Sequence, residues 1–290
     1  MQQILFRIPG LGLPIFGYGL MLFLAFLGSM QLAAWRARRE GLDRELVLDL
    51  ALYLFVGGLV GARLFYVIQK WGTQIHSVWE AFKIWEGGIV LYGSLIGAAV
   101  AFFLYRALRP FPLRPYLDCL APSMALGVAL GRIGCFLNGC CYGDLCEIPG
   151  LGVSFPAGSA PWDQQVYAGL IGKDAARSLP VHATQLYSAL DGFLLLALLN
   201  AFYPLRRRDG EVMGMLLLAY PVGRFLIEYL RNDEPAIVLG MTISQAISAL
   251  LLLGTLAYWG WLATLPKARW VDEHPPQAEP AAEGATPATA

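Results

Sequence analysis

The stretch Gly131–Asp144, GRIGCFLNGCCYGD, places several reactive or charged groups at the end of a long apolar run. It carries Arg132, an asparagine, three cysteines and a tyrosine among four glycines. A cation at membrane depth is costly unless an anion lies beside it, so Arg132 is a candidate for binding an anionic group. The alternative is a kinked helix end whose arginine snorkels to the membrane surface.

A second charged group lies in a later apolar run, where Arg224, Glu228 and Arg231 are spaced i, i+4 and i+7. Side chains at this spacing share one face of a helix. Arg224 and Glu228 alone form an ion pair that neutralises itself. With Arg132 at the same membrane face, however, the arginines outnumber the carboxylates. A guanidinium matches phosphate oxygens and keeps its charge when desolvated, so this combination predicts a site for an anionic lipid phosphate.

The composition indicates a membrane protein. Of the 290 residues 57% are hydrophobic and 14% are charged, against about 25% charged in soluble domains. A formal net charge of zero gives no indication of a nucleic-acid partner. Seven mostly apolar runs approach the roughly 20 residues that a membrane helix needs, which predicts an all-α polytopic protein. The runs are residues 15–35, 46–68, 88–108, 116–137, 183–203, 212–230 and 241–264.

Basic residues alternate between the loops, which predicts the orientation in the membrane. They follow the first, third, fifth and seventh runs: Arg36, Arg38, Arg39, Arg44; Arg106, Arg109, Arg114; Arg206, Arg207, Arg208; Lys267 and Arg269. We therefore expect the N-terminus outside and the C-terminus in the cytoplasm. The outward loop 138–182 is long enough for a small extracytoplasmic cap, and the aromatic segment 69–87 is expected on the outer membrane surface. Residues 1–270 form one predicted domain, followed by a Pro/Ala-rich tail, 271–290, that is expected to be disordered.

Further polar residues fall in the predicted outer half: Tyr18, Tyr92, Arg63, His182 and Gln185. Each has an ordinary interpretation. The tyrosines suit the membrane interface, Arg63 suits a snorkelling position, and His182 suits a helix start that faces water. Their coincidence at one face favours a common site instead.

Repeated pairs of small residues predict close contacts between helices. The pairs are Gly57 with Gly61, Gly93 with Gly97, and Gly127 with Gly131.

Four of the five cysteines follow the spacing C-x4-C-C-x4-C: Cys135, Cys140, Cys141 and Cys146. This is not a familiar zinc-ribbon spacing, and only His182 is an obvious imidazole nearby, so no metal site is predicted. If the loop faces an oxidising compartment, a disulfide among the last three is favoured. A reactive nucleophile would lack a clear activating base. The fifth cysteine, Cys119, is predicted to be a packing residue.

These residues resemble the phosphatidylglycerol–prolipoprotein diacylglyceryl transferase family, over most of the chain from about Tyr18 to about Ile247. The most specific matches are Gly131-Arg132-Ile133-Gly134, Phe136, Asn138-Gly139 and Tyr142-Gly143. Supporting matches are Gly17-Tyr18-Gly19, Gly61-Ala62-Arg63, Gly88 through Gly97, His182 with Gln185-Leu186-Tyr187, Gly223-Arg224-Phe225 with Glu228, and Thr242 with Gln245.

The resemblance implies an enzyme of the bacterial inner membrane that moves the diacylglyceryl group of phosphatidylglycerol onto the lipobox cysteine of a prolipoprotein and releases glycerol phosphate. The implied partners are phosphatidylglycerol, the signal peptide of a prolipoprotein and membrane lipids. No metal or organic cofactor is expected, since both substrates supply the reacting groups. Arg132 and Arg224 would stabilise the leaving phosphate, Glu228 would orient Arg224, and Tyr92 or His182 would accept the thiol proton. The residues implied in substrate binding are Arg132, Asn138, Tyr18, Gly143, Arg63 and Gln185.

The chain departs from the family pattern at four positions. Cys135 stands where asparagine is common, Cys140 where glutamate or glutamine is frequent, Tyr92 where many members have histidine, and Ser188 where glutamate is usual. The general base therefore stays open, as does a paralogue with altered activity. Two other classes remain in view: a transporter or binding protein for an anionic solute, and a thiol sensor built on the cysteines.

Overall fold

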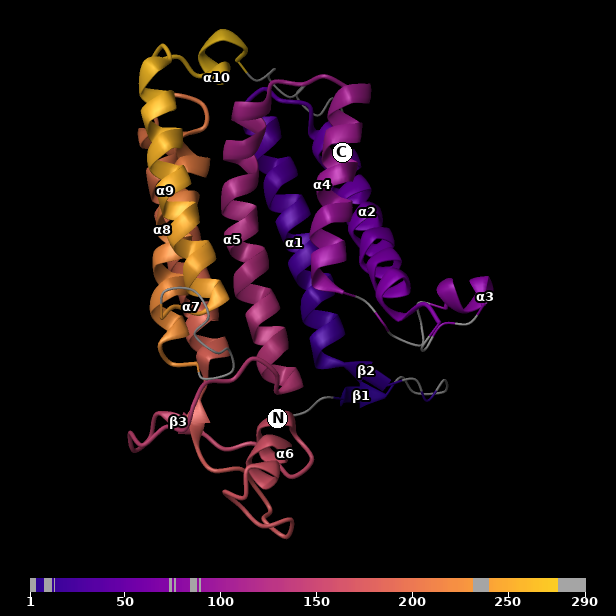
Figure 1. Ribbon diagram of the computed structural model, residues 1–290. Coiled ribbons are helices and arrows are strands. Elements are labelled where there is room, and N and C mark those ends of the chain that lie inside the picture. Colours follow the sequence, from indigo (N-terminus) through magenta and orange to yellow (C-terminus); the bar gives the residue numbers. More distant parts are fainter. Residues whose placement is uncertain are drawn as a thin grey trace, which may run out of the picture. The chain divides into compact units, whose positions relative to one another are not determined.

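The computed structural model describes residues 4–7, 12, 14–72, 75, 77–83, 88, 90–231 and 240–275 (Figure 1). The helices are α1 (Gly17–Arg39), α2 (Arg44–Lys70), α3 (Val78–Ala81), α4 (Leu91–Leu108), α5 (Leu113–Asn138), α6 (Ala160–Tyr167), α7 (Thr184–Phe202), α8 (Glu211–Glu228), α9 (Ile243–Thr264) and α10 (Trp270–Glu273), with a 3-10 turn η2 (Tyr203–Leu205). Two antiparallel strand pairs accompany them: β1 (Ile4–Arg7) with β2 (Pro14–Phe16), and β3 (Gly152–Val153) with β4 (Val181–His182).

Each of the seven predicted apolar runs coincides with one helix: α1, α2, α4, α5, α7, α8 and α9. Within the described chain, five helical segments are long and apolar enough to cross a membrane by length and composition, namely α1, α2, α5, α7 with η2, and α9. The apolar part of α4, Gly93–Leu108, is shorter, and α8 carries three charged residues. The helical multi-pass architecture is confirmed, whereas the number of seven crossings stays a prediction.

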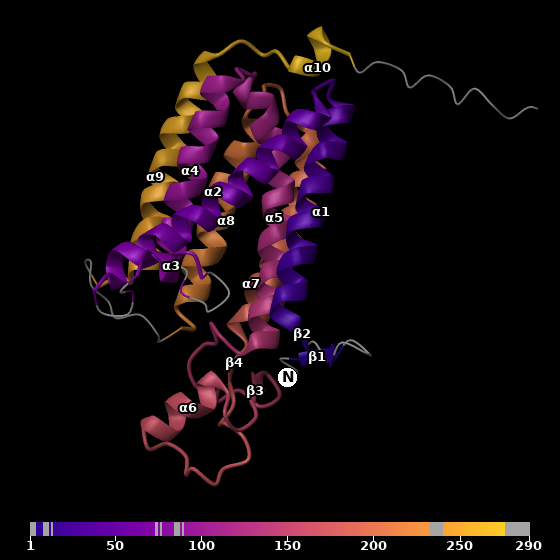
Figure 2. The same ribbon diagram turned by 90° about the vertical axis from the view of Figure 1, so that its right-hand side faces the viewer.

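The chain divides into two compact units, one of residues 1–33 with 117–273 and one of residues 34–116 with 274–290. In the first unit the consecutive helices α7, α8 and α9 run in alternating directions, and α5 lies beside them (Figures 1 and 2). Their core joins side chains of α5, α7 and α8: Ala121, Ala125, Leu195, Leu199, Val212, Met213 and Leu216. Small residues permit this approach, since a Cβ on Gly192 would lie 3.0 Å from Ala129.

The directions of the helices decide which residues share an end of the first unit. Both α5 and α8 run from the end that bears α10 to the end that bears β3, β4 and α6 (Figure 1). Arg132 and Arg224 lie toward the C-terminal ends of these two helices. The prediction that the two arginines share one face of the protein therefore agrees with the helix directions.

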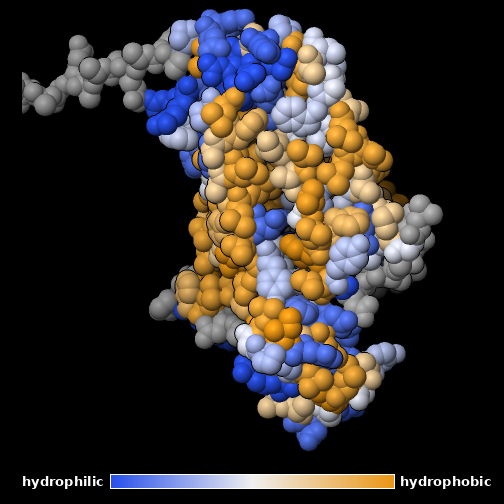
Figure 3. Space-filling model, turned by 90° about the vertical axis from the view of Figure 1, so that its left-hand side faces the viewer, coloured by the Kyte–Doolittle hydropathy of each residue, from blue (hydrophilic) through white to orange (hydrophobic). Residues whose placement is uncertain are grey.

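Between α5 and α7 the chain forms a small cap that contains β3, α6 and β4. Phe155 is buried within it at 1% exposure, and the indole of Trp162 donates to the carbonyl of Ala175 at 2.7 Å. On the face shown in Figure 3, a broad hydrophobic band separates the cap from the hydrophilic end of the molecule. Such a band between two polar ends is typical of a membrane-embedded surface.

In the second unit α2 packs closely on α4 through the predicted small residues. A Cβ on Gly57 would lie 2.9 Å from the carbonyl oxygen of Gly97, and one on Gly61 would lie 2.7 Å from the Cα of Gly97. A Cβ on Gly93 would lie 2.5 Å from the Cβ of Phe65. The close contact is confirmed here. The same prediction of a close helix contact is wrong for Gly131 in the first unit, where an added Cβ would meet no atom within 4 Å.

The predicted surface segment 69–87 exposes its described aromatic side chains, Trp71, Trp79 and Phe82. Trp85 and most of the predicted tail 271–290 lie outside the described residues. The first residues assigned to that tail, Val271–Glu273, belong instead to α10.

Candidate active site

Arg132 occupies the last part of α5, and its side chain is partly buried. Two residues later Gly134 lets α1 approach, because a Cβ there would lie 3.3 Å from the ring of Tyr18. Within the part of the chain that the structure describes, no hydrogen bond or ion pair engages Arg132. Its positive charge is therefore available to an anionic ligand.

Arg224 has partners in the protein. Its Nη1 donates to the Glu228 carboxylate and its Nη2 donates to Ser244 Oγ at 2.9 Å. Glu228 is 2% exposed, and it also accepts from Thr242 Oγ1 at 3.0 Å. The predicted ion pair is confirmed, and each oxygen of its carboxylate accepts a hydrogen bond.

The prediction that Arg231 shares a helix face with Arg224 and Glu228 is wrong. The helix α8 ends at Glu228, so Arg231 lies beyond it. Its Nε still approaches Glu228 Oε2 at 4.0 Å. Glu228 thus serves two arginines, and positive charge remains in excess at this end of the first unit, as the sequence predicted.

The sequence interpretation missed a further carboxylate, Asp191 of α7. A Cβ on Gly223 would lie 2.6 Å from its Oδ2, so the carboxylate packs directly on the backbone of α8 and would have to shift for a larger residue. The detectable signal was an acidic residue inside the apolar run that follows His182.

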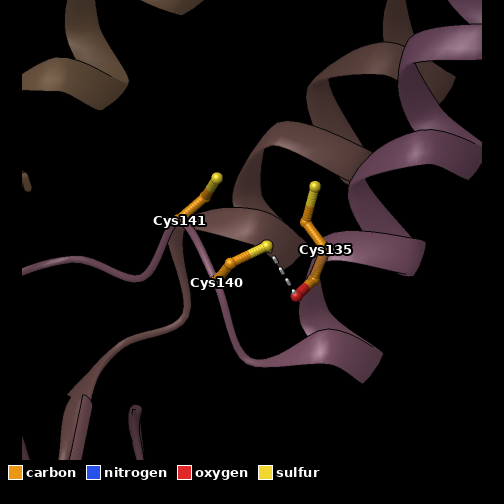
Figure 4. Close-up of side chains that lie close together, drawn as sticks. All are labelled: Cys135, Cys140 and Cys141. Atoms are coloured by element: carbon orange, nitrogen blue, oxygen red, sulfur yellow. Dashed lines mark hydrogen bonds between the residues drawn. The ribbon is translucent and has the colours of Figure 1, made fainter. Parts of the chain in front are cut away.

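The end of α5 folds three cysteines together. The Cys135 carbonyl accepts the N–H groups of Gly139 at 2.9 Å and Cys140 at 3.2 Å, which closes the helix. Gly139 and Cys141 then adopt positive φ angles of 77° and 60°, and this reverses the chain. As a result the sulfur atoms of Cys135, Cys140 and Cys141 lie within 4.8 Å of one another (Figure 4).

Cys146 does not belong to this three-cysteine cluster. Its sulfur lies 3.8 Å from the Ile148 carbonyl oxygen. All five cysteines are free thiols, so the expected disulfide among Cys140, Cys141 and Cys146 is corrected. The thiols that can react or bind together are those of Cys135, Cys140 and Cys141. Cys119 is fully buried beside Tyr203, as expected for a packing residue.

The N-terminus of α7 holds the cysteine loop. Thr184 Oγ1 donates to the Cys141 carbonyl at 2.8 Å, and Gln185 Nε2 donates to the Cys140 carbonyl at 2.7 Å. Gln185 has no exposed surface. Gly143 donates its N–H to the His182 carbonyl at 2.8 Å, and an added Cβ would lie 2.8 Å from the His182 Cβ. Both residues therefore position the loop, and their direct contact with a substrate stays a prediction.

Three other predicted residues keep accessible side chains around the loop. Tyr18 is 37% exposed, and Asn138 is exposed and hydrogen-bonds Cys140. His182 ends strand β4, where its Nδ1 lies 3.5 Å from the Tyr187 hydroxyl.

Electrostatics favour negative charge on one thiol of the cysteine loop, that of Cys141. Hydrogen bonds from the thiols of Cys135 and Cys140, followed by the charges of Arg132 and Arg231, hold the pKa of the Cys141 thiol well below its usual range. The two arginines therefore lie close enough to act on an anion bound at this loop.

Arg63 and Tyr92 belong to the second unit. Arg63 is buried, and its guanidinium donates to the carbonyls of Glu80 at 2.6 Å, Ala81 at 2.8 Å and Gly88 at 3.1 Å. The snorkelling interpretation is wrong for Arg63, and a role in substrate binding stays a prediction. Tyr92 lies in the first turn of α4, and its side chain is outside the described part of the chain.

Comparison with known proteins identifies the family. Residues 3–261 match the family model described as prolipoprotein diacylglyceryl transferase. The chain belongs to the prolipoprotein diacylglyceryl transferase family. The resemblance seen in the sequence is thus confirmed, and the protein is classed as a transferase of that family, which favours an enzyme over a transporter or a sensor.

Named relatives support the same assignment over most of their length. The chain is 33% identical over 248 residues to the phosphatidylglycerol–prolipoprotein diacylglyceryl transferase of Clostridium tetani, covering 86% of this chain and 92% of the relative. It is 34% identical over 264 residues to the protein of that name from Thermus thermophilus, covering 84% and 93%. It is 34% identical over 253 residues to the one from Vibrio vulnificus, covering 84% and 86%.

In this prolipoprotein diacylglyceryl transferase family member, the first unit alone brings together an arginine without a protein partner in the described chain, a restrained arginine and a group of thiols. The first two suit the recognition of a phosphate. The three sulfur atoms are the group in the described chain that is able to hold a metal ion.

Proposed function

We infer that this chain transfers the diacylglyceryl group of phosphatidylglycerol to the thiol of a prolipoprotein's lipobox cysteine. The reaction forms a thioether and releases glycerol phosphate, as the first step of lipoprotein maturation. The family and the names of the relatives support the reaction. The observation that carries the assignment of the site is Arg132, which has no anionic partner among the described residues although it lies toward the end of a membrane helix.

The phosphate is the part of the lipid that the site has to stabilise. The acceptor thiolate attacks the glycerol carbon bonded to the phosphate ester oxygen, the C–O bond breaks, and its electron pair leaves with the phosphate. Arg132 donates to the phosphate oxygens on which charge develops, a role worth several kcal/mol in comparable sites. Arg224 supports the same charge, since Glu228 and Ser244 hold its guanidinium in place.

The acceptor must lose a proton, because the thiolate is the nucleophile. His182 and Tyr92 are the side chains proposed to accept it. Imidazole is the side-chain type of the two that more often acts as a general base, and the His182 ring is oriented by the contact of Nδ1 with the Tyr187 hydroxyl. Tyr18 and Asn138 hydrogen-bond the lipid headgroup in this mechanism, because both side chains are accessible beside the loop.

The proposed orientation puts the N-terminus and the cap outside the cytoplasm and the C-terminus inside. The basic loops support it, since arginine and lysine accumulate on the cytoplasmic side of membrane proteins. The end of the first unit that carries Arg132 and Arg224 then faces the outer leaflet, where a secreted precursor presents its signal peptide and lipobox cysteine.

The test is transfer by the purified protein in detergent, with phosphatidylglycerol and a lipobox peptide as substrates. Mass spectrometry is expected to find a diacylglyceryl adduct on the peptide's cysteine and glycerol phosphate in the solution. A peptide with serine in place of the cysteine is the control and should stay unmodified. A folded protein that forms no adduct, beside an active relative under the same conditions, contradicts the proposal.

A further inference from the structure

The three-cysteine cluster has the dimensions of a zinc site. Zinc holds thiolate sulfurs at about 2.3 Å in tetrahedral geometry, which separates two sulfurs by about 3.8 Å. The sulfurs of Cys135, Cys140 and Cys141 already lie within 4.8 Å of one another, so shifts of about 1 Å or less would accommodate the ion. A disulfide needs sulfurs at about 2.05 Å and would leave one of the three thiols unused.

The loop is held in this arrangement by the protein and not by the cysteines themselves. The carbonyls of Cys140 and Cys141 accept hydrogen bonds from Gln185 and Thr184 at 2.7 and 2.8 Å, and both donors are buried. Such outer contacts orient metal ligands and raise the affinity of a site. Among the described residues, no fourth histidine, cysteine or carboxylate joins the cluster.

We propose that Cys135, Cys140 and Cys141 bind one zinc ion, and that its fourth position takes the sulfur of the acceptor cysteine. Three protein ligands with one open position are the arrangement of catalytic zinc, whereas structural zinc has four protein ligands. The second part of the proposal rests on the proposed function, because only a thiol-alkylating enzyme presents a thiol there.

Zinc would supply the thiolate that the reaction needs. A thiol that coordinates a metal ion is deprotonated, and its proton passes to the base proposed above, His182 or Tyr92. The zinc-bound sulfur then attacks the glycerol carbon, the S–C bond forms, and the C–O bond breaks with its electron pair on the released glycerol phosphate. Zinc keeps its oxidation state, and the thioether product is a weak ligand that leaves the fourth position open again.

The charges around the cluster suit this complex. One zinc ion with four thiolates carries a net charge of two negative units. Arg132 precedes Cys135 by three residues on α5, and the Leu230 carbonyl beside Arg231 accepts the N–H of Asp144, just after the cysteine loop, at 2.9 Å. Two cationic residues therefore lie on segments next to the cluster. The donor phosphate and the acceptor sulfur would thus meet beside Arg132, which links the cluster to the phosphate site.

The first experiment measures zinc binding, independently of activity. The full-length protein in detergent is incubated with zinc chloride under reducing conditions, freed of excess metal, and analysed for zinc and protein. One zinc per chain is expected, and serine at any of Cys135, Cys140 or Cys141 should remove most of it. Serine at Cys119 or Cys146 is the matched control, since both sulfurs lie outside the cluster, and these variants should keep the zinc.

Absence of zinc from the wild-type protein overturns the site, as does equal retention by the cluster variants and the controls. A disulfide within the cluster of the purified protein, found by mass spectrometry of its peptides, overturns it too. Far-ultraviolet circular dichroism and gel filtration of each variant separate loss of the site from loss of the fold.

The second experiment asks whether the acceptor reaches the metal. Cobalt replaces zinc, and its visible absorption reports the ligands. A lipobox peptide should shift the cobalt bands as a fourth sulfur binds, whereas the peptide with serine in place of cysteine should leave them unchanged. If the cobalt bands do not shift when the cysteine peptide is added, the proposed role of the fourth position is overturned.

The third experiment separates this inference from the proposed function. Protein stripped by a chelator should lose transfer by about 100-fold, the effect expected for loss of thiol activation, and zinc but not magnesium should restore it. Full transfer by the metal-free protein overturns the catalytic zinc while the proposed function stands. A protein that binds zinc through the three cysteines yet forms no adduct leaves the site standing and contradicts the proposed function.

Discussion

The two ends of the first unit both contain buried charges, but these charges are satisfied in opposite ways. At the end bearing α10, Asp118 has no exposed surface, accepts the N–H groups of Gly210 at 2.8 Å and Met213 at 3.0 Å, and lies 3.6 Å from Arg206 Nε. The Arg206 guanidinium also stacks 4.1 Å from the Tyr203 ring centroid. At the other end Arg132 has no such partner in the described chain.

The comparison separates charges that stabilise the fold from charges that are available to a substrate. Asp118 caps the N-terminus of α8 and pairs with Arg206, so this carboxylate and this guanidinium are engaged within the protein. At the opposite end one buried carboxylate, Glu228, serves Arg224 and Arg231, and Arg132 remains. An arginine in a membrane helix therefore indicates function only when its anionic partners have been counted.

Arg132→Ala is expected to have the largest effect on the rate of transfer. Transfer should fall by about 100- to 1000-fold, the usual effect of removing one donor to a developing oxyanion. The melting temperature should stay near that of the wild type, because the guanidinium holds no other described part of the protein together. Rates measured with phosphatidylglycerol and a lipobox peptide check this, and Arg132→Lys, which keeps the charge without the fork, should fall between the two. Near-normal transfer by the folded alanine variant would remove Arg132 from the mechanism.

Asp118→Ala tests the end of the first unit that bears α10. It leaves Arg206 buried without its carboxylate and removes the cap of α8, so the free energy of unfolding should drop by about 3 kcal/mol or more. The rate per folded molecule should not change, because this network lies at the other end of the helices. Thermal unfolding in detergent and an active-site titration measure the two quantities. Asp118→Asn retains one acceptor oxygen and should lose less stability, and a selective loss of rate would contradict the assignment.

Glu228→Gln tests the difference between Arg132 and Arg224, which lie toward the end of the first unit that bears the cap. The amide keeps the shape of the side chain but removes the charge that holds Arg224, so transfer should fall by roughly tenfold. We expect the change mainly in kcat, because Glu228 positions Arg224 and does not touch the lipid. A change confined to the melting temperature would make Glu228 purely structural. Thr242→Ser is the control and should keep the wild-type rate, since it retains the hydroxyl that donates to the same carboxylate and caps α9.

Arg269→Ala gives the smallest effect and calibrates the others. Its hydrogen bonds hold the pKa of the Asp272 carboxyl below its usual range. A depressed pKa contributes stability above the unfolded-state pKa, and this is lost as the pH falls through the lower folded-state pKa. The Asp272 side chain is exposed to solvent, which screens such a pair. The melting temperatures of the variant and the wild type should therefore agree at pH 7 and at pH 4, and a clear difference would show that surface pairs matter here.

Much of the architecture followed from local properties of the sequence. The seven apolar runs coincide with seven helices, since hydrophobicity over about 20 residues is a property of neighbouring residues. The Arg224–Glu228 pair followed from the helical period, and the family followed from short matches in a fixed order. The end of α8 before Arg231 was not predicted, because a helix boundary depends on contacts beyond the helix.

The sequence by itself determined that the chain is a helical membrane protein of the prolipoprotein diacylglyceryl transferase family, and that Arg132 is its leading candidate for phosphate binding. Only the tertiary structure decided which cysteines meet and which side chains hold the cysteine loop in place. Cys135 replaced Cys146 in the cluster because the chain reverses at Gly139, and α7 fixes that reversal through hydrogen bonds between residues 43 and 45 positions apart. Those contacts join distant parts of the chain, and spacing along the sequence does not encode their distances.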